Sequence, residues 1–496
     1  MKSYHDAISC RNSLQTPFAV LEERRKAGKK MDATALTEMQ SWLERSGLQI
    51  SDLDKLNIIH VAGTKGKGTT CAFVDSILNQ HRRKYSTPKK IGLYTSPHLV
   101  YVRDRIRINS EPISEDMFAR YFFEVWDALE ASASAAREDV PTKPVYFRFL
   151  TLMSWHVFLK EGVDAAIYEV GVGGAWDSTN VVQTPIVTGI TTLGIDHVAV
   201  LGDTLAKIAW HKAGIFKKGV PAFSVPQDPE AVEVLKNRAF EIGVQYLHFI
   251  NIDPFVYDVN VVPDADYQRG NISLAIALVV AAAEELGLKE LRPDIRPEVF
   301  KGGLEQTVWR GRCETKFDGP RRWRLDGAHT VDSLKVATQW FAAQQVSGSD
   351  TNTFRILLFN QQTRPGQEAD NLLRVLQHEL INSCGIRFDH VIFSTNVTAK
   401  NTGYRIEFEN RNASTQAVKE LTVQKRFAEV WAEADTTATI HLASTIQEAV
   451  ELAQALSENQ ETTEILVTGS IHLVGGVLAL LEGASSPSST NSLSND

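Results

Sequence analysis

The sequence predicts a two-domain α/β protein whose first domain is built on a doubly wound, mainly parallel sheet. Three observations predict it: the length of 496 residues, strand-like apolar runs that alternate with helix-like segments, and a glycine-rich loop that follows one of those runs. A chain of this length exceeds the size at which one hydrophobic core usually keeps growing. Strands that alternate with helices favour parallel βαβ units.

The strand-like runs divide into two groups along the chain. In the first half they lie at residues 57–62, 91–95, 165–170 and 186–192. In the second half they lie at residues 322–325, 354–359, 390–393 and 464–467. The second group predicts a smaller, Rossmann-like α/β domain. We therefore predict domains at 1–306 and 307–482, followed by a disordered tail at 483–496, where Ser, Pro, Asn and Asp offer little apolar surface to bury.

Composition excludes several classes of protein. The 52 basic and 60 acidic residues are mixed along the chain, which gives no electrostatic footprint for nucleic acid or for stable membrane association. The four cysteines are scattered, without the spacing of a zinc site or of a disulfide framework, so a reducing compartment is expected. We expect a cytoplasmic monomer, with a mitochondrial pool as the alternative location.

The strongest local signal is the glycine-rich segment GTKGKGTT at residues 63–70. Glycines let backbone N–H groups turn toward a polyphosphate, Lys67 supplies a positive charge, and a threonine hydroxyl at the start of the following helix can reach Mg²⁺. The strict P-loop pattern is not met, because Val61 and Gly68 replace the required Gly and Ser or Thr. A flexible surface turn is the alternative, but strand, glycines, lysine, hydroxyls and helix follow in the order that phosphate binding requires.

Polar residues follow three other predicted strands. Ser96 and His98 follow one strand, Glu169 ends another before a run of glycines, and His197 lies just beyond a third. Ligands of open α/β sheets bind at the carboxyl ends of the strands, so these groups suggest one magnesium-binding rim. The ordinary alternatives are that Ser96 forms a turn before proline, that Glu169 is an exposed strand end and that His197 is a buried histidine.

Lys212 lies on the apolar stripe of a predicted helix that Asp203 or Thr204 caps and Gly214 ends. A lysine buried there has a lowered pKa, which makes its neutral amine available for reaction or modification. The alternative is a side chain that reaches solvent from the end of the helix.

With these residues assembled, the chain resembles the folylpolyglutamate synthases of the Mur ligase superfamily, and the eukaryotic branch in particular. The resemblance covers nearly the whole chain. Its motifs are HVAGTKGKGTTCAF from His60, SPHLVYVRDRIRIN from Ser96, YFRFLTLMSWHVFL from Tyr146, EVGVGGAWDSTN from Glu169, GIDHVAVLGDTLAKIAWHKAGIF from Gly194, QRGN from Gln268, LDGAHTVDS from Leu325, LLFN from Leu357 and VTGSIHLVGGVLALL from Val467.

The resemblance implies a set of roles for these residues. The implied ATP contacts are Gly63, Thr64, Lys65, Gly66, Lys67, Gly68, Thr69, Thr70, Gln268, Asn271, Arg312, Asp326 and His329. The implied metal ligands are Ser96, Glu169, His197 and, if it carries a carbamate, Lys212. The implied catalytic residues are Lys67, His197, Lys212 and Arg312. The cofactors would be ATP and two Mg²⁺ ions, in a cleft between the domains.

Some positions depart from the commoner bacterial pattern of the family. His211 stands where a Glu often precedes the lysine, which leaves the surroundings of a carbamate open. Arg310 occupies a usual proline, and Thr330-Val331 replaces Asn-Pro. The form DGAHT supports placement in the eukaryotic branch.

The segment after His98 carries Arg103, Arg105 and Arg107, which alternate with other residues. On an extended strand their side chains would share one face. We hypothesise that His98 and these arginines help to guide the anionic glutamate tail of the substrate; Arg105 also matches an arginine of the family. A solvated strand edge is the alternative.

The implied reaction is ATP-dependent addition of L-glutamate to the γ-carboxylate of reduced folates and folylpolyglutamates through an acyl-phosphate. Two alternatives remain. One is dihydrofolate synthase, alone or combined with tail extension, because that activity shares the scaffold. The other is a nucleotide-binding regulator without catalysis. A cell-wall peptide ligase fits the motifs less well.

Overall fold

The computed structural model describes residues 2–17, 20, 23, 32–137, 139–345, 353–362, 366–399, 407 and 415–483. The chain divides into two compact units. Unit 1 comprises Met1–His98 and Val102–Trp309, and unit 2 comprises Leu99–Tyr101 and Arg310–Asp496. The sequence did not indicate that Leu99–Tyr101 belongs to unit 2. The predicted disordered tail lies, apart from Gly483, outside the described residues.

Unit 1 is built on an eight-stranded sheet, sheet A, with the order β4-β3-β2-β5-β1-β6-β7-β8. Six strands from β2 to β8 in this order are parallel, and β3 and β4 are antiparallel at one edge. The strands are β1 Ile58–Ala62, β2 Ile91–Tyr94, β3 Ile106–Ile108, β4 Glu111–Pro112, β5 Ala165–Glu169, β6 Val187–Ile190, β7 Ala222–Ser224 and β8 Leu247–Phe249. The mainly parallel sheet is as predicted, although β3, β4, β7 and β8 were not anticipated.

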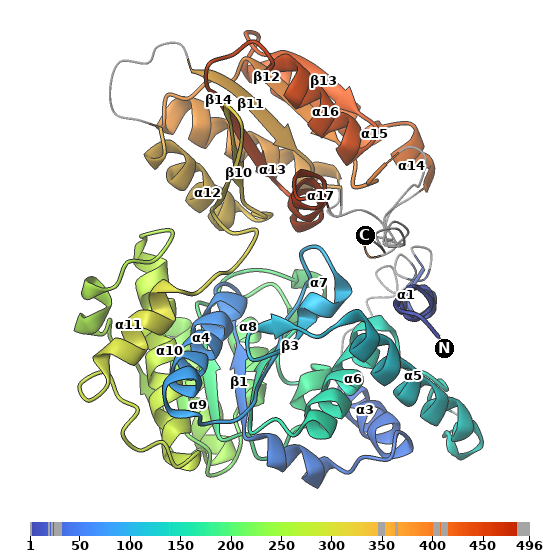
Figure 1. Ribbon diagram of the computed structural model, residues 1–496, viewed down its shortest axis with the longest axis vertical. Coiled ribbons are helices and arrows are strands. Elements are labelled where there is room, and N and C mark those ends of the chain that lie inside the picture. The colour runs from blue at the N-terminus through green and yellow to red at the C-terminus, as the bar shows by residue number, and fades with distance from the viewer. Residues whose placement is uncertain are drawn as a thin grey trace, which may run out of the picture. The chain divides into compact units, whose positions relative to one another are not determined.

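Helices cover both faces of sheet A (Figure 1). Ile59 and Val61 of β1 pack into one core with α4 and α10, whereas Ala62 packs into another with α8 and α9. Because successive strand side chains point to opposite faces, a strand buried on both faces is apolar throughout. The helices are α1 Tyr4–Ser13, α3 Thr34–Arg45, α4 Lys67–Tyr85, α5 Glu115–Ala131, α6 Tyr146–Glu161, α7 Val198–Leu201, α8 Leu205–Lys212, α9 Pro229–Ile242, α10 Asp266–Glu285 and α11 Pro297–Glu305.

Unit 2 is built on a six-stranded sheet, sheet B, with the order β13-β12-β11-β14-β10-β9. All neighbours are parallel except the edge pair of β9 and β10. Its elements are β9 Glu314–Asp318, β10 Arg321–Leu325, α12 Val331–Ala343, β11 Phe354–Phe359, α13 Gly366–His378, β12 His390–Ser394, α14 Thr415–Lys419, α15 Thr422–Ala434, β13 Thr439–Ala443, α16 Ile446–Leu456, β14 Thr463–Thr468 and α17 Ile471–Leu481.

The two faces of sheet B are covered by different helices (Figure 1). Leu357 and Phe359 of β11 pack with α12, α13 and α15. Ile356 and Leu358 pack with α16 and α17, in a core that also contains Val100. This three-layer arrangement is the predicted second α/β unit.

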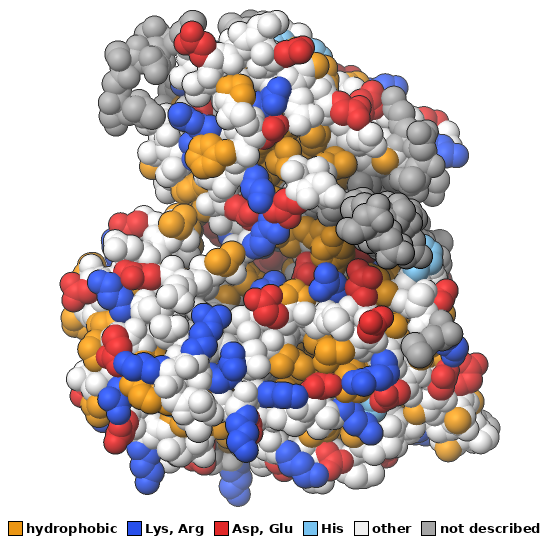
Figure 2. Space-filling model, viewed as in Figure 1, with side chains coloured by type: hydrophobic (Ala, Val, Ile, Leu, Met, Phe, Trp, Pro, Cys, Tyr) orange, Lys and Arg blue, Asp and Glu red, His pale blue; other side chains and the backbone are white. Residues whose placement is uncertain are grey.

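Basic and acidic side chains are interspersed on the face of the molecule shown in Figure 2, in agreement with the mixed charge of the sequence. In the part of the chain that the structure describes, no helix combines the length and the apolar character needed to cross a bilayer.

Candidate functional site

The glycine-rich loop at residues 63–70 connects β1 to α4, and its shape requires glycine at two positions. A Cβ atom on Gly63 would lie 1.8 Å from Thr191 Oγ1, and one on Gly66 would lie 2.2 Å from Asn271 Oδ1. Both glycines also have a positive φ, 147° and 86°. The loop therefore follows a path that a side chain would block.

The start of α4 is where this loop can bind an anion. The helix begins at Lys67, and the N–H groups of a first helical turn have no partner within the helix. The Lys67 ammonium lies 3.5 Å from the carbonyl oxygen of Thr64, so the side chain folds back over the loop. Thr69 is partly exposed, whereas Thr70 is buried, so the Thr69 hydroxyl is the more accessible of the two candidates.

The segment after β6 holds the loop from the other side. The N–H groups of Thr64 and Lys65 donate to the carbonyl of Thr192 at 2.9 and 3.1 Å. The Thr64 hydroxyl donates to the carbonyl of Gly194 at 3.1 Å, and the Lys65 ammonium lies 3.8 Å from the Asp196 carboxylate. The structure thus joins the phosphate loop to the segment that carries Asp196.

Glu169 and Ser96 come together at the carboxyl ends of β5 and β2. The backbone N–H of Ser96 donates to Glu169 Oε2 at 2.9 Å, and only 5% of Glu169 is exposed. The same oxygen would lie 3.3 Å from a Cβ atom on Gly68, so the Glu169 carboxylate lies beside the start of α4. The structure thus brings these two predicted metal ligands to the phosphate loop.

His197, the third predicted metal ligand, is exposed and has a left-handed backbone, with φ 52° and ψ 39°. It directly precedes the short helix α7. Among the described residues, no three His, Cys, Asp or Glu side chains gather into a group that could hold a metal. A site completed by a hydroxyl and by phosphate oxygens is the arrangement that Mg²⁺ commonly takes, because it keeps few protein ligands.

Lys212 points inward from the end of α8, and only 2% of it is exposed. Of the two alternatives from the sequence, this is the buried lysine and not the side chain that reaches solvent. The predicted cap is also present, since the Thr204 hydroxyl accepts from the N–H of Lys207. Burial, reinforced by the nearby Lys67 charge, lowers the pKa of Lys212 well below its usual value. Asp177, Asp196 and Glu169 act in the opposite direction and therefore lie within electrostatic range of the amine.

Gln268 and Asn271, two of the implied ATP contacts, lie one turn apart on α10. The Asn271 amide donates to Gln268 Oε1 at 3.0 Å, and its own Oδ1 lies against Gly66. The structure therefore places Asn271 directly on the phosphate loop. Contact of either residue with ATP stays a prediction.

The expectation that Arg103, Arg105 and Arg107 share one face of an extended segment is wrong. Val102–Arg105 forms a 3₁₀ helix, and β3 begins only at Ile106, so the alternation of a strand does not apply. Arg105 is buried, and its Nε donates to Nδ1 of His98 at 3.1 Å. Arg107 instead lies over the ring of Trp309, 5.5 Å from its centroid, and Arg103 donates to the carbonyl of Ile113.

The predicted nucleotide contacts of unit 2 lie around the end of β10. Asp326 is buried, which raises the pKa of its carboxyl, while the nearby Arg312 charge acts in the opposite direction. Its two oxygens accept from the backbone N–H groups of Cys313 and Ala328, both at 2.8 Å. His329 Nδ1 lies 2.8 Å from the carbonyl of Gly327 and donates to it.

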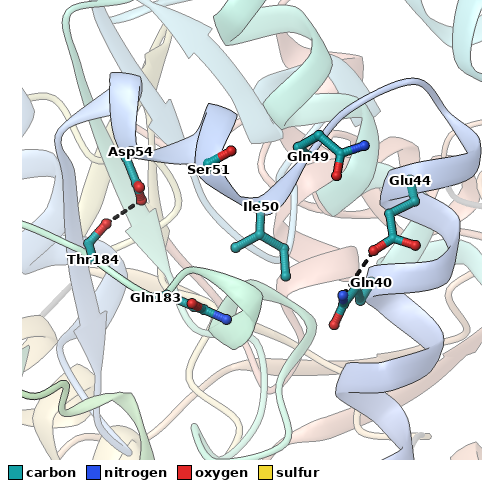
Figure 3. Close-up of a pocket in the computed structure, with 8 residues that line it drawn as sticks. All are labelled: Gln40, Glu44, Gln49, Ile50, Ser51, Asp54, Gln183 and Thr184. Atoms are coloured by element: carbon teal, nitrogen blue, oxygen red, sulfur yellow. Dashed lines mark hydrogen bonds between the residues drawn. The ribbon is translucent and has the colours of Figure 1, made fainter.

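A polar hollow of about 340 Å³ lies elsewhere in unit 1, between α3, the 3₁₀ helix Ile50–Leu56 and the segment before β6 (Figure 3). Asp54 precedes β1, and Gln183 and Thr184 precede β6, so the hollow is at the amino ends of these strands. The phosphate loop follows the carboxyl end of β1. None of the predicted site residues lines the hollow, and we do not assign the chemistry to it.

Two residues beside the site were not singled out in the sequence. Trp309 would meet a Cβ atom on Gly68 at 2.8 Å, which explains why Gly68 replaces the Ser or Thr of the strict P-loop pattern. Asp177 is buried and lies near Lys212. Asp177 could have been found from its place in the motif EVGVGGAWDSTN. Trp309 could not, because its contact with Gly68 depends on the fold.

Comparison of the sequence with known proteins gives full-length relatives. The chain is 52% identical over 495 residues to folylpolyglutamate synthase of Neurospora crassa, which covers 97% of this chain and 92% of that protein. Residues 313–480 match the family model described as dihydrofolate synthetase, C-terminal domain.

Solved structures share the fold. Mycobacterium tuberculosis folylpolyglutamate synthase complexed with ADP aligns with a TM-score of 0.68 at 23% identity, over 93% of this chain and 98% of that chain. A folylpolyglutamate synthase complex with AMPPCP and folate aligns with a TM-score of 0.65 at 23% identity, over 94% and 100%. These similarities show that the α/β architecture of both units is a known one.

Proposed function

This chain belongs to the folylpolyglutamate synthase family, and we propose that it uses ATP to join L-glutamate to the γ-carboxylate of reduced folates and folylpolyglutamates. The observation that carries the proposal is the 52% identity, over 97% of this chain, to folylpolyglutamate synthase of Neurospora crassa. The geometry supports it, because the glycine-rich loop and Glu169 lie at the carboxyl ends of two central strands of sheet A, and Lys212 lies within electrostatic range of Glu169.

The chemistry requires activation of a carboxylate, which is a poor electrophile because its charge repels nucleophiles and oxide is a poor leaving group. In the proposed reaction, an oxygen of the γ-carboxylate attacks the γ-phosphorus of ATP, and ADP leaves. The amine of glutamate then attacks the acyl carbon, phosphate leaves and the amine loses a proton. The Lys67 ammonium and the N–H groups at the start of α4 would hold the phosphates, mainly by position and charge.

The donor set beside the phosphate loop fits Mg²⁺. Glu169 supplies a carboxylate, Ser96 a hydroxyl and His197 an imidazole, and the first two lie beside the start of α4. When bound, Mg²⁺ would neutralise negative charge on the phosphate oxygens. We propose that these three residues hold one ion and that Lys212 serves a second.

For Lys212 we propose a carbamate. The neutral amine would attack the carbon of CO₂ and lose a proton, which converts a buried neutral amine into a carboxylate-like group. The lowered pKa of Lys212, caused by burial and the Lys67 charge, supports this. Incubation with carbon-13-labelled CO₂ should give a carbamate resonance that Lys212→Ala lacks; the same spectrum from both proteins would exclude the modification.

The activity is tested by incubating the protein with tetrahydrofolate, labelled glutamate, ATP and Mg²⁺. We expect ADP release that depends on both folate and glutamate, together with labelled folate of increasing tail length. Lys67→Ala should lose both signals. A wild-type protein that binds ATP but releases no ADP under these conditions would instead be the nucleotide-binding regulator.

Dihydrofolate synthase is the second candidate, because the family model that matches residues 313–480 carries that description. The two activities differ in the acceptor of glutamate. Dihydropteroate offered in place of tetrahydrofolate separates them: glutamate incorporation into dihydropteroate alone would reverse the assignment, and incorporation into both would show a bifunctional enzyme.

We also propose that the protein works as a cytoplasmic monomer, with a mitochondrial pool as the alternative. None of Cys10, Cys71, Cys313 and Cys384 forms a disulfide bond, which supports a reducing compartment. Fractionation of cells and light scattering of the purified protein test the two parts of this proposal separately.

A further inference from the structure

The segment at residues 170–181 follows Glu169 and is connected to β1 by a chain of buried hydrogen bonds. His60 Nε2 on β1 lies 2.9 Å from Thr179 Oγ1. The Thr179 hydroxyl lies 2.7 Å from Asp177 Oδ1, and the N–H of Val172 donates to Asp177 Oδ2 at 3.0 Å. The strand that leads into the phosphate loop is thus connected to the segment that leaves Glu169.

The direction of each hydrogen bond follows from the chemistry of the groups. Burial lowers the pKa of His60 to about 3, so its ring is neutral and carries one proton. The carboxylate of Asp177 can only accept, so the Thr179 hydroxyl donates to it. Thr179 Oγ1 must then accept from His60, which places the His60 proton on Nε2 and leaves Nδ1, which is buried without a partner, unprotonated.

The same segment contacts the end of α8, where Lys212 lies. The N–H of Ala175 donates to the carbonyl of His211 at 2.7 Å, and the Asn180 amide donates to the carbonyl of Gly214 at 2.9 Å. A Cβ atom on Gly174 would lie 2.9 Å from the carbonyl oxygen of Lys212. Because the backbones touch, a shift of the segment would move the backbone of Lys212.

We propose that Thr179, oriented by His60, is a positioning residue that fixes the 170–181 segment and with it the relative positions of Glu169 and Lys212. The proposal rests on the proposed function, in which these two side chains serve the metal site. Groups that orient metal ligands through hydrogen bonds typically change metal affinity or activity by about 10- to 100-fold when they are removed. Thr179 itself would touch neither metal nor substrate.

The test compares Thr179→Val, which has the same shape but no hydroxyl, with Thr179→Ser, which keeps the hydroxyl. Mn²⁺ is titrated into each protein in the presence of ADP, and bound ion is measured by electron paramagnetic resonance without turnover. We expect Thr179→Val to bind Mn²⁺ at least about tenfold more weakly and to need a correspondingly higher Mg²⁺ concentration for half-maximal ADP release. Thr179→Ser should stay close to the wild type.

Thr184→Val is the matched control. The Thr184 hydroxyl donates to Asp54 beside the polar hollow at the amino ends of the strands (Figure 3). The control therefore loses a Thr–Asp hydrogen bond away from the site, in this case one that is exposed to solvent. It should leave Mn²⁺ binding unchanged, since loss of stability alone does not alter the metal site.

A folded Thr179→Val protein with wild-type Mn²⁺ affinity would overturn the proposal. If that variant does not fold, His60→Leu keeps the Thr179–Asp177 hydrogen bond and removes only its support; about tenfold weaker Mn²⁺ binding is then expected, and wild-type binding would equally overturn the proposal. Failure of the proposed function is a separate result, namely a wild-type protein that binds Mn²⁺ and ADP but shows no glutamate-dependent ADP release.

Discussion

Single residues decide the geometry of the phosphate site. Lys212 is buried although lysine is rarely buried, and the cost of desolvating its charged form appears as a lowered pKa. Gly66 and Gly68 are required for different reasons: Gly66 has a positive φ and meets Asn271, whereas Gly68 leaves room for Trp309 and Glu169. The sequence showed that glycines were present, but not which neighbour makes each one necessary.

Gly66→Ala should abolish activity even in protein that remains folded. The new methyl group would meet Asn271 Oδ1 at 2.2 Å and displace the start of α4, and misplacement of about 1 Å can cost about 100-fold in rate. Steady-state ADP release measures it. Gly47→Ala is the control, because Gly47 has a nearly identical φ of 87° with nothing within 4 Å. Equal activities of the two variants would show that Asn271 and the loop readily make room.

At the scale of elements, α4 is tied to the hairpin of β3 and β4 by a buried polar cluster. Asp75 on α4 accepts from the Ser110 hydroxyl at 2.6 Å, and the Asn79 amide donates to Ser110 at 2.8 Å. Burial raises the pKa of Asp75 to about 6, while the Ser110 hydrogen bond and the nearby Arg107 charge act in the opposite direction. The helix that begins in the phosphate loop is therefore held by a group that titrates near neutral pH.

The raised pKa of Asp75 should make the free energy of unfolding depend on pH. Its folded pKa of about 6 is above the ordinary aspartate value of 3.8, so the folded state takes up a proton more readily than the unfolded state. The resulting stabilisation is fully present below pH 3.8 and is lost as the pH rises through 6. Relative to Asp75→Asn, the wild type should therefore gain on the order of 2–3 kcal/mol as the pH falls from 7.5 toward 4. Urea unfolding of both proteins measures this, and parallel stability curves would contradict it.

Sheet B contains a buried ion pair, and we expect its loss to destabilise the protein. Arg324 on β10 donates to Glu464 on β14 at 2.7 and 3.1 Å, and both side chains are buried. Glu464→Gln leaves the guanidinium without its counter-charge, so we expect a loss of about 3–5 kcal/mol in unfolding free energy. Asp318→Asn, which breaks the more exposed pair with Arg321, should cost less than about 1 kcal/mol. Similar losses in chemical denaturation would show that burial does not set the difference.

At the scale of the whole molecule, the chain passes between the two units more than once. Leu99–Tyr101 belongs to unit 2 although the flanking residues belong to unit 1. Val100 is buried in the core that α16 and α17 form on sheet B. Unit 2 therefore needs three residues from the first half of the sequence to complete its core.

A fragment that begins at Arg310 should consequently be less stable than unit 2 in the full chain. It lacks Val100, and burial of a valine side chain contributes about 1.5–3 kcal/mol. A synthetic peptide of residues 96–104 added to the fragment should raise its melting temperature, which differential scanning fluorimetry measures. The same peptide with Val100→Asp is the control. No shift with the native peptide would mean that the segment contributes nothing to unit 2.

Elements with local signals could be predicted from the amino-acid sequence. The runs at 57–62 and 354–359 became β1 and β11, Thr204 capped α8, and the order of residues at 63–70 gave a loop at a helix start. These features depend on backbone preferences and on periodicity within a few residues, so they can be read from the chain. The same holds for the family, because its motifs are contiguous.

The contacts between residues far apart in the sequence became known from the folded structure. It separated Arg105 from Arg107, placed Trp309 on Gly68 and Asp177 near Lys212, and assigned Val100 to unit 2. Such contacts join residues that are far apart in sequence, and they form because the summed burial of both cores favours one packing. A pattern of a few residues does not reveal this total burial energy. The sequence therefore indicated the residues of the site, and the fold determined how they are arranged.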